Sequence, residues 1–333
     1  MAVLKTKYLG IELKNPLIVG ACSLTSNMDT IKKLEDSGAG AIVIKSLFEE
    51  QIQLKSYALN EALHKYDEWH AEMVSIFPDL SDPGPEEHLM WVRKAKAASS
   101  IPVFASLNAV NRETWVDWAK KLAETGVDGL ELNFFASPTD FSRSALSVEN
   151  EQAEIMREVK KAVKIPVAVK LSPFYTNSLE FVKRLDSTGV EGFVLFNRPF
   201  EPSIDIEQEK SDMPFNLSTP NDHRLALRFI GLLSGKVNGS LCASNGIHTA
   251  SNAVEMLLAG ADAFQMVSAL YRSTAATVKT VLDELSAWMD RKGYKTLADF
   301  RGKLDAENNP DKNAYRRTQY VKLLVHPESH LKR

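Results

Sequence analysis

The chain has 333 residues, of which 44% are hydrophobic and 25% are charged, and its formal net charge is −3. This composition is typical of a soluble globular protein, and the length suits one large α/β barrel or two smaller domains. The near-neutral charge gives no electrostatic reason to expect nucleic acid or an anionic membrane as a partner. No stretch approaches the ~20 apolar residues of a membrane span, and the N-terminal residues do not resemble a signal peptide, so we expect a cytoplasmic protein without membrane contact.

The two cysteines, Cys22 and Cys242, lie far apart, each within an apolar run, and the seven histidines are scattered. This spacing argues against a disulfide framework and against a zinc site, and it favours a reducing compartment. We therefore expect no metal ion.

Eight short apolar runs alternate with amphipathic helical patterns. The runs span residues 17–21, 41–45, 103–107, 129–133, 167–171, 192–197, 240–244 and 263–267. The helical patterns include residues 28–37, 113–124, 151–163, 178–187, 223–233, 250–258 and 275–292. Nearly continuous apolar runs fit strands that are buried on both faces of a parallel sheet. Repeated eight times, the pattern predicts a (β/α)8 TIM barrel rather than a doubly wound open sheet.

Three segments fall outside this pattern. Residues 8–13 alternate like a short N-terminal hairpin that would close the bottom of the barrel, and residues 46–85 form a long insertion after the second strand, as expected of a lid or an interface. The last stretch carries a stripe of Tyr315, Tyr320 and Leu323, typical of a helix packed on the barrel or on another subunit. The predicted organisation is a barrel over residues 1–304 and a C-terminal extension over residues 305–333.

Polar residues stand where several of the apolar strands end. Lys45 and Lys170 each close such a run, and an ammonium there must be paired or wet, although a surface lysine is the simpler alternative. Asn133 and Asn197 end two further strands, and either could merely cap the following loop. The carboxyl ends of barrel strands meet at one mouth. We therefore expect these side chains, with Asn108 nearby, to form a circle of hydrogen-bond donors and acceptors suited to the edge of a planar heterocycle.

The loops after the seventh and eighth strands carry a phosphate signal. The first contains Ser244, Asn245 and Gly246, and the second contains Ser268 and Ala269. Barrels commonly bind phosphate with these two loops, and a glycine lets the backbone approach the anion closely. The alternative is a tight turn followed by a serine cap. Ser137 precedes a proline, and Ser-Pro is first of all a turn; the functional alternative is that its hydroxyl is an acid-base group in a loop over the site.

An ordered series of motifs resembles the dihydroorotate dehydrogenases, a family of FMN-dependent barrels. The series runs through Asn15-Pro16-Leu17, Val43-Ile44-Lys45-Ser46, Leu130-Glu131-Leu132-Asn133, Val169-Lys170-Leu171-Ser172-Pro173, Asn245-Gly246-Ile247 and Gly293-Tyr294-Lys295-Thr296-Leu297. These motifs occur in order along nearly the whole barrel.

The resemblance implies FMN as the cofactor and assigns the site residues. FMN would contact Ala21, Cys22, Ser46, Asn108, Asn133, Lys170, Ser244, Asn245, Gly246, Ser268 and Ala269. The substrate would contact Lys45, Asn133, Thr139, Asn197 and Arg198. Catalysis would fall to Ser137, Lys170 and Lys45, with Ser137 removing the C5 proton of (S)-dihydroorotate while hydride passes from C6 to flavin N5. Lys170 would stabilise negative charge on the reduced flavin.

Several alternatives stay open. Thr139 and Arg198 depart from the family pattern on the substrate side, so another dihydropyrimidine or a cyclic enone-like compound is a second possible substrate. A Schiff-base aldolase with Lys170 as the nucleophile, and a flavin-binding barrel without turnover, are further alternatives. We expect a homodimer, with a soluble electron acceptor or a partner subunit.

Overall fold

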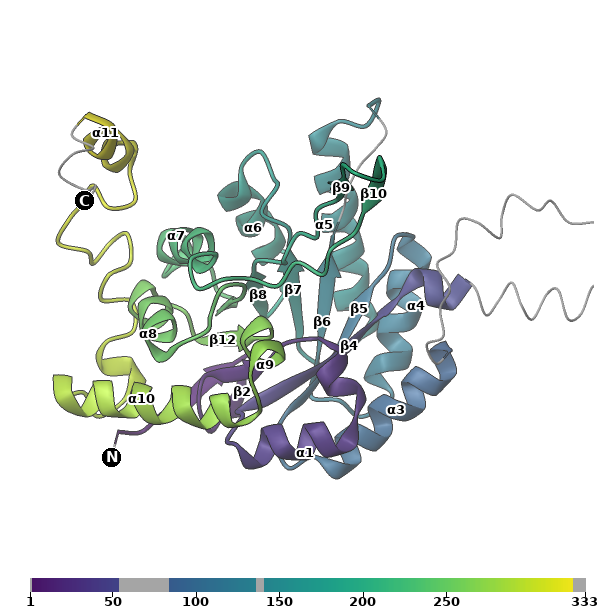
Figure 1. The fold of residues 1–333 in the computed structure, drawn as a ribbon. Helices are drawn as coiled ribbons and strands as arrows, with labels where there is room; N and C mark the ends of the chain where they lie inside the picture. The colour runs from purple at the N-terminus through teal and green to yellow at the C-terminus, as the bar shows by residue number, and fades with distance from the viewer. Residues whose placement is uncertain (1, 54–83, 136–140, 326–333) are drawn as a thin grey trace, which may run out of the picture.

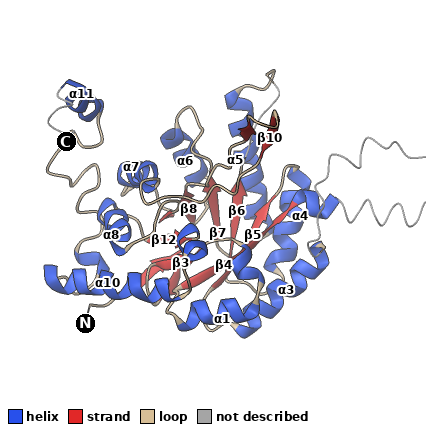
Figure 2. Ribbon diagram, viewed as in Figure 1, coloured by secondary structure: helices blue, strands red, loops and turns tan. Residues whose placement is uncertain are grey.

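The computed structural model describes residues 2–53, 84–135 and 141–325. Eight parallel strands close into a barrel in the order β11-β12-β3-β4-β5-β6-β7-β8, surrounded by helices (Figures 1 and 2). The strands are β3 (Leu17–Val19), β4 (Ala41–Phe48), β5 (Val103–Asn108), β6 (Gly129–Phe134), β7 (Val167–Leu171), β8 (Gly192–Leu195), β11 (Ser240–Ala243) and β12 (Ala263–Met266). The predicted TIM barrel is therefore confirmed, and each strand overlaps the apolar run expected for it.

The helices mostly follow the predicted amphipathic patterns. They are η1 (Ser23–Ser26), α1 (Met28–Asp36), α3 (Pro85–Ala98), α4 (Arg112–Ala123), α5 (Ala145–Ala162), α6 (Ser178–Asp186), α7 (His223–Leu233), α8 (Ala250–Ala259), α9 (Ser268–Arg272), α10 (Ala276–Lys292), η2 (Leu297–Asp299) and α11 (Arg317–Val325). Helix α3 was not predicted; it begins at Pro85, the last residue of the expected insertion, with that proline in its first turn. Helix α5 begins earlier than predicted, because Ser144 caps it by accepting a hydrogen bond from the Ser147 N–H.

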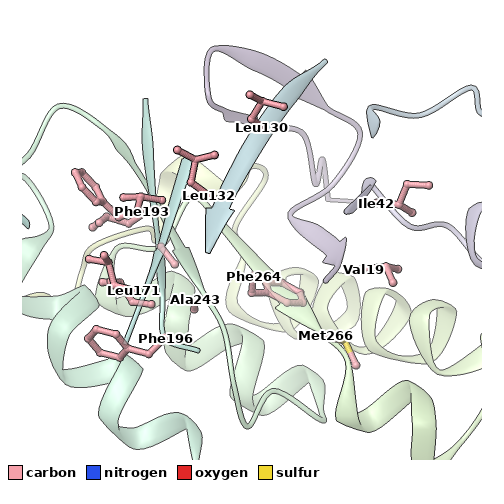
Figure 3. Close-up of a cluster of buried hydrophobic side chains, with 14 of the residues drawn as sticks. Val19, Ile42, Leu130, Leu132, Leu171, Phe193, Phe196, Ala243, Phe264 and Met266 are labelled. Carbon is pink, nitrogen blue, oxygen red and sulfur yellow. The ribbon is translucent and has the colours of Figure 1, made fainter. Parts of the chain in front are cut away.

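Strand side chains alternate between two separate apolar regions. Those that point outward, such as Leu130, Leu132 and Leu171, join a cluster that includes buried residues of the surrounding helices (Figure 3). Those that point inward fill the lower part of the barrel, where Ile18, Val43 and Phe104 are at most 1% exposed. This division follows from the two-residue period of a strand.

The N-terminal hairpin closes the bottom of the barrel, as predicted. Strands β1 (Thr6–Tyr8) and β2 (Ile11–Leu13) pair antiparallel, and both turn residues, Leu9 and Gly10, have positive φ, as a two-residue hairpin turn requires. The buried ring of Tyr8 packs edge-on against Phe104, with 5.8 Å between the ring centroids. The hairpin therefore covers the apolar end of the barrel interior.

Two further segments extend from the barrel. The loop after β8 contains an unpredicted short hairpin, β9 (Ser203–Asp205) and β10 (Lys210–Asp212). Beyond Leu304 the chain first runs along α7, where the Ala306 N–H donates to Gly231 O at 2.8 Å and the Ser234 hydroxyl donates to buried Asp305 at 3.0 Å. The Tyr315 hydroxyl donates a 2.6 Å hydrogen bond back to the Leu304 carbonyl. Helix α11 stands apart from the barrel and has no buried residue (Figure 1). Across the described ranges, no helix combines the length and the apolar character needed to cross a membrane.

Candidate active site

A cavity of 440 Å³ lies at the carboxyl ends of the barrel strands. Most of the residues that the sequence singled out line it: Ala21, Cys22, Lys45, Ser46, Asn133, Lys170, Asn197, Arg198, Ser244, Asn245, Gly246 and Ser268. Asn108 and Ala269 are not among the residues that line this cavity. Ser137 and Thr139 lie outside the described residues.

A β-bulge in β4 brings two neighbouring residues to the same cavity. The pairing of β4 with β5 slips between Ile44 and Leu47, so Lys45 and Ser46 both line the wall instead of pointing to opposite faces. The Ser46 hydroxyl makes a 2.7 Å hydrogen bond to the hydroxyl of Ser106, which points into the barrel. The Lys45 backbone is held by the Thr25 hydroxyl at 2.9 Å.

Lys170 lies at the floor of the cavity within a buried polar network. Its Nζ donates to Gln265 Oε1 at 2.9 Å and lies 3.5 Å from Glu131 Oε1. The Gln265 amide also donates to Glu131 Oε2, so the three side chains form a closed group that joins β6, β7 and β12. The ammonium is thus paired rather than free, although it faces the cavity. Glu131 and Gln265 also line the cavity, although neither was predicted as a site residue.

Asn133 and Asn197 meet directly above this group. The Asn197 side-chain amide donates to Asn133 Oδ1, and the Asn197 backbone N–H donates to Leu171 O at 2.9 Å. Because Asn133 pairs with Lys170 in the β6–β7 register, both amides lie close to the ammonium. Together they offer donors and acceptors to the edge of a planar ligand.

The glycine loop forms another wall. Asn245 and Gly246 have φ of 75° and 74°, and a Cβ at position 246 would overlap the backbone nitrogen of His223. Only glycine fits this close approach without displacing backbone. Asn245 Oδ1 is buried and has no hydrogen-bond partner in the part of the chain that the structure describes.

The long loop after β8 completes this wall, which the sequence did not predict. The Ser218 N–H donates to the Ser268 hydroxyl at 3.0 Å, and the Ser218 hydroxyl accepts the Gly246 N–H at 3.3 Å. Arg198 fixes the loop through Asn216, with hydrogen bonds of 3.1 and 2.9 Å, and through Asp222 at 3.1 Å. Arg198 therefore acts on its own loop, whatever further contact it makes with a ligand.

The first-strand side of the cavity carries a thiol and a phenol. Burial raises the pKa of the Cys22 thiol and also the pKa of Tyr271. The Tyr271 hydroxyl is held by Ser23, which contacts it through its backbone N–H at 2.9 Å and its hydroxyl at 2.6 Å. Both groups are therefore neutral near pH 7 and offer contacts rather than charge.

A parallel barrel with an ammonium and paired amides lining a cavity at its mouth, beside a glycine loop, defines a ligand-binding TIM barrel. The family model described as dihydroorotate dehydrogenase matches residues 79–289. The chain is 28% identical over 310 residues to the catalytic subunit of dihydroorotate dehydrogenase B (NAD(+)) from Thermoplasma acidophilum, an alignment that covers 91% of this chain and 99% of that protein. It is 27% identical over 298 residues to the protein of the same name from Methanocaldococcus jannaschii, covering 86% and 94% of the two chains.

The chain belongs to the dihydroorotate dehydrogenase family and is an oxidoreductase, which confirms the resemblance found in the sequence and removes the aldolase alternative. Membership of this family implies a flavin cofactor.

Proposed function

We propose that the protein oxidises (S)-dihydroorotate to orotate with FMN bound in the 440 Å³ cavity. The observation that carries this proposal is that Lys170, Asn133, Asn197 and the loop at Gly246 line one cavity. A cation and amides can bind the edge of an isoalloxazine ring, and backbone N–H groups can bind the FMN phosphate, and the cavity offers both kinds of group.

The residues fit FMN in two respects. The backbone at Gly246 approaches closely enough that no side chain is tolerated, as at other backbone-lined anion sites. The Gly246 and Ser218 N–H groups donate to hydroxyl oxygens, which a phosphate can replace as acceptors. FMN, when bound, supplies N5 as the acceptor of the hydride from substrate C6.

We assign the remaining chemistry to side chains of this chain. Lys45, Asn133 and Asn197 bind the substrate over the ring, where the paired amides can turn to meet its carbonyl and N–H groups. Ser137 removes the proton from C5, and a water or neighbouring group relays that proton because a hydroxyl alone is a weak base. Thr139 and Arg198 complete the substrate side.

The relatives named above are called catalytic subunits and carry NAD(+) in their names. By analogy we propose that electrons leave this chain through a partner subunit to NAD⁺, and that the catalytic chain itself forms a homodimer. Light scattering of the purified chain tests the dimer, and NADH formation that appears only with an added flavoprotein partner tests the electron path.

Anaerobic titration tests the substrate. The 450 nm flavin band is expected to bleach with (S)-dihydroorotate and to persist with dihydrouracil, which lacks the carboxylate that Lys45 would contact. Bleaching by dihydrouracil alone would move the assignment to another dihydropyrimidine, and bleaching by neither would favour a barrel without this turnover.

Replacing the proposed base tests the mechanism. Ser137→Ala is expected to slow substrate-driven flavin reduction by ~100-fold or more, while Ser137→Cys retains part of the rate because a thiol can also accept a proton. Stopped-flow absorbance at saturating dihydroorotate measures both rates. A change of less than a few-fold in the alanine variant would leave Ser137 as a turn residue.

A further inference from the structure

The group formed by Glu131, Gln265 and Lys170 holds a carboxylate in the floor of the cavity, which all three residues line. The side chains of Lys170 and Glu131 are only 10% and 3% exposed, and Gln265 is 2% exposed. Gln265 orients both charges at once, since its Oε1 accepts from Lys170 and its Nε2 donates to Glu131. The ammonium position is therefore fixed from below.

The carboxylate is held for its charge more than for its hydrogen bonds. Glu131 Oε1 has no hydrogen-bond partner within the described ranges, and what approaches it is the ammonium at 3.5 Å. A buried charge is costly unless it is paired, and a neutral glutamine pair could have tied the three strands together at lower cost. A carboxylate at this position makes the local charge close to zero instead of +1.

The groups below Glu131 do not alter this balance. Tyr8 and Cys242 face it from the apolar half of the barrel, and burial raises the pKa of both far above neutrality. Both groups are uncharged near pH 7, so the charge sensed at the cavity floor comes from Lys170 and Glu131 as a pair.

We infer that Glu131 is a positioning residue that fixes the Lys170 ammonium and, as its counter-charge, lowers the reduction potential of the flavin above it. The inference rests on the proposed function, because it requires FMN over Lys170. A reduced flavin carries negative charge, which the ammonium stabilises and the deeper carboxylate opposes. Without Glu131 the same ammonium would favour the reduced flavin more strongly. After dihydroorotate oxidation, the reduced flavin would then transfer its electrons to the acceptor less readily.

Opposite shifts in reduction potential distinguish this role from a structural one. In Glu131→Gln, which keeps the shape and the contact with Gln265, the two-electron reduction equilibrium of bound FMN is expected to favour the reduced form by about tenfold more, or ~30 mV. In Lys170→Met the same equilibrium is expected to favour the reduced form less, by a similar factor. The double variant is expected to lie near wild type, which general damage to the barrel cannot produce.

The experiment measures FMN affinity by fluorescence quenching and the midpoint potential by equilibration with reference dyes, on the full chain loaded with FMN. Cys242→Ala, a neutral change in the same interior, is the control and is expected to leave the potential unchanged. If Glu131→Gln does not fold, the comparison of the double variant with Lys170→Met carries the test, with the double variant expected to be higher by about tenfold in the equilibrium.

Wild-type protein that binds no FMN would overturn the proposed function, and this inference with it. Wild-type protein that binds FMN while Glu131→Gln leaves the potential unchanged or lowers it would overturn the counter-charge role alone. If Glu131→Gln does not fold, equal midpoint potentials for Lys170→Met and the double variant would likewise overturn the counter-charge role.

Discussion

The two ends of the barrel interior are built from the same strands but from opposite chemistry. At the lower end, Tyr8 and Leu9 of the N-terminal hairpin pack on Ile18 and Phe104, and the space is filled. At the upper end, inward-facing positions of the same strands carry residues such as Ser106, Glu131, Lys170 and Gln265, and the space is a cavity. Closure at one end provides stability and leaves the other end open for ligand chemistry.

The largest effect is expected from breaking the filled end. Phe104→Ala removes a ring that is 1% exposed and packed on Tyr8, and it is expected to lower the free energy of unfolding by about 3 to 5 kcal/mol. Urea denaturation measures this change. Phe174→Ala, at a side chain 72% exposed, is the matched control and is expected to stay within about 0.5 kcal/mol of wild type. If Phe104→Ala did not lower the free energy of unfolding, the filled end of the barrel would not be the end that provides stability.

The corresponding change at the open end affects chemistry more than folding. Lys170→Ala is expected to slow flavin reduction by dihydroorotate by about 100- to 1,000-fold, because the charge that favours the reduced flavin is lost. FMN is expected to remain bound, since the loop at Gly246 that we propose to hold its phosphate is unchanged. Lys292→Ala, at an exposed position at the end of α10, is the control for loss of a lysine. Unchanged reduction kinetics in Lys170→Ala would remove this residue from the mechanism.

A third variant separates cofactor binding from folding stability and from flavin reduction. Gly246→Ala forces a Cβ into the His223 backbone, and it is expected to weaken FMN binding on the order of 100-fold. Gly235→Ala is a matched control, because Gly235 also has positive φ, 70°, but has open space around it. Fluorescence titration that gives equal Kd values for the two variants would show that backbone strain, and not the loop at Gly246, accounts for the loss.

The smallest effect is expected from alkylation of the two cysteines, one at each end of the barrel interior. Cys22 lines the cavity and is 8% exposed, whereas Cys242 is fully buried in the interior. We expect iodoacetamide to label Cys22 alone in the folded protein and FMN to slow that labelling by about tenfold. Because burial raises the pKa of the Cys22 thiol, the labelling rate should keep rising above the ordinary thiol pKa of ~8.5. Peptide mass spectrometry checks both sites, and faster labelling of Cys242 would contradict the comparison.

The barrel and much of its mouth could be predicted because the signals are local. A lysine that closes an apolar run, such as Lys45 or Lys170, marks the solvent-facing end of a buried strand, and a glycine-containing loop after the seventh strand marks one wall of the cavity. Glu131 and Gln265 carry the same kind of signal as Lys170, a polar residue inside an apolar strand. Neither was predicted as a site residue, because their contacts with Lys170 form only when three separate strands fold around one axis.

The rest of the site depends on contacts that no local pattern encodes. Ser218 reaches the glycine loop because Arg198 holds Asn216 and Asp222, and these are long-range contacts within an irregular segment. Asn108 ends its strand as expected, but the bulge in β4 pairs it with Phe48 at the rim. The family resemblance supplied the assignment of Ser137 and Thr139, which spacing alone did not give.

A crystal structure of the FMN-loaded protein tests the central claim most directly. We expect the isoalloxazine ring within hydrogen-bonding distance, ~3 Å, of Lys170 Nζ and the phosphate beside the Gly246 backbone. A flavin ring remote from Lys170, or a phosphate bound away from the Gly246 loop, would contradict it.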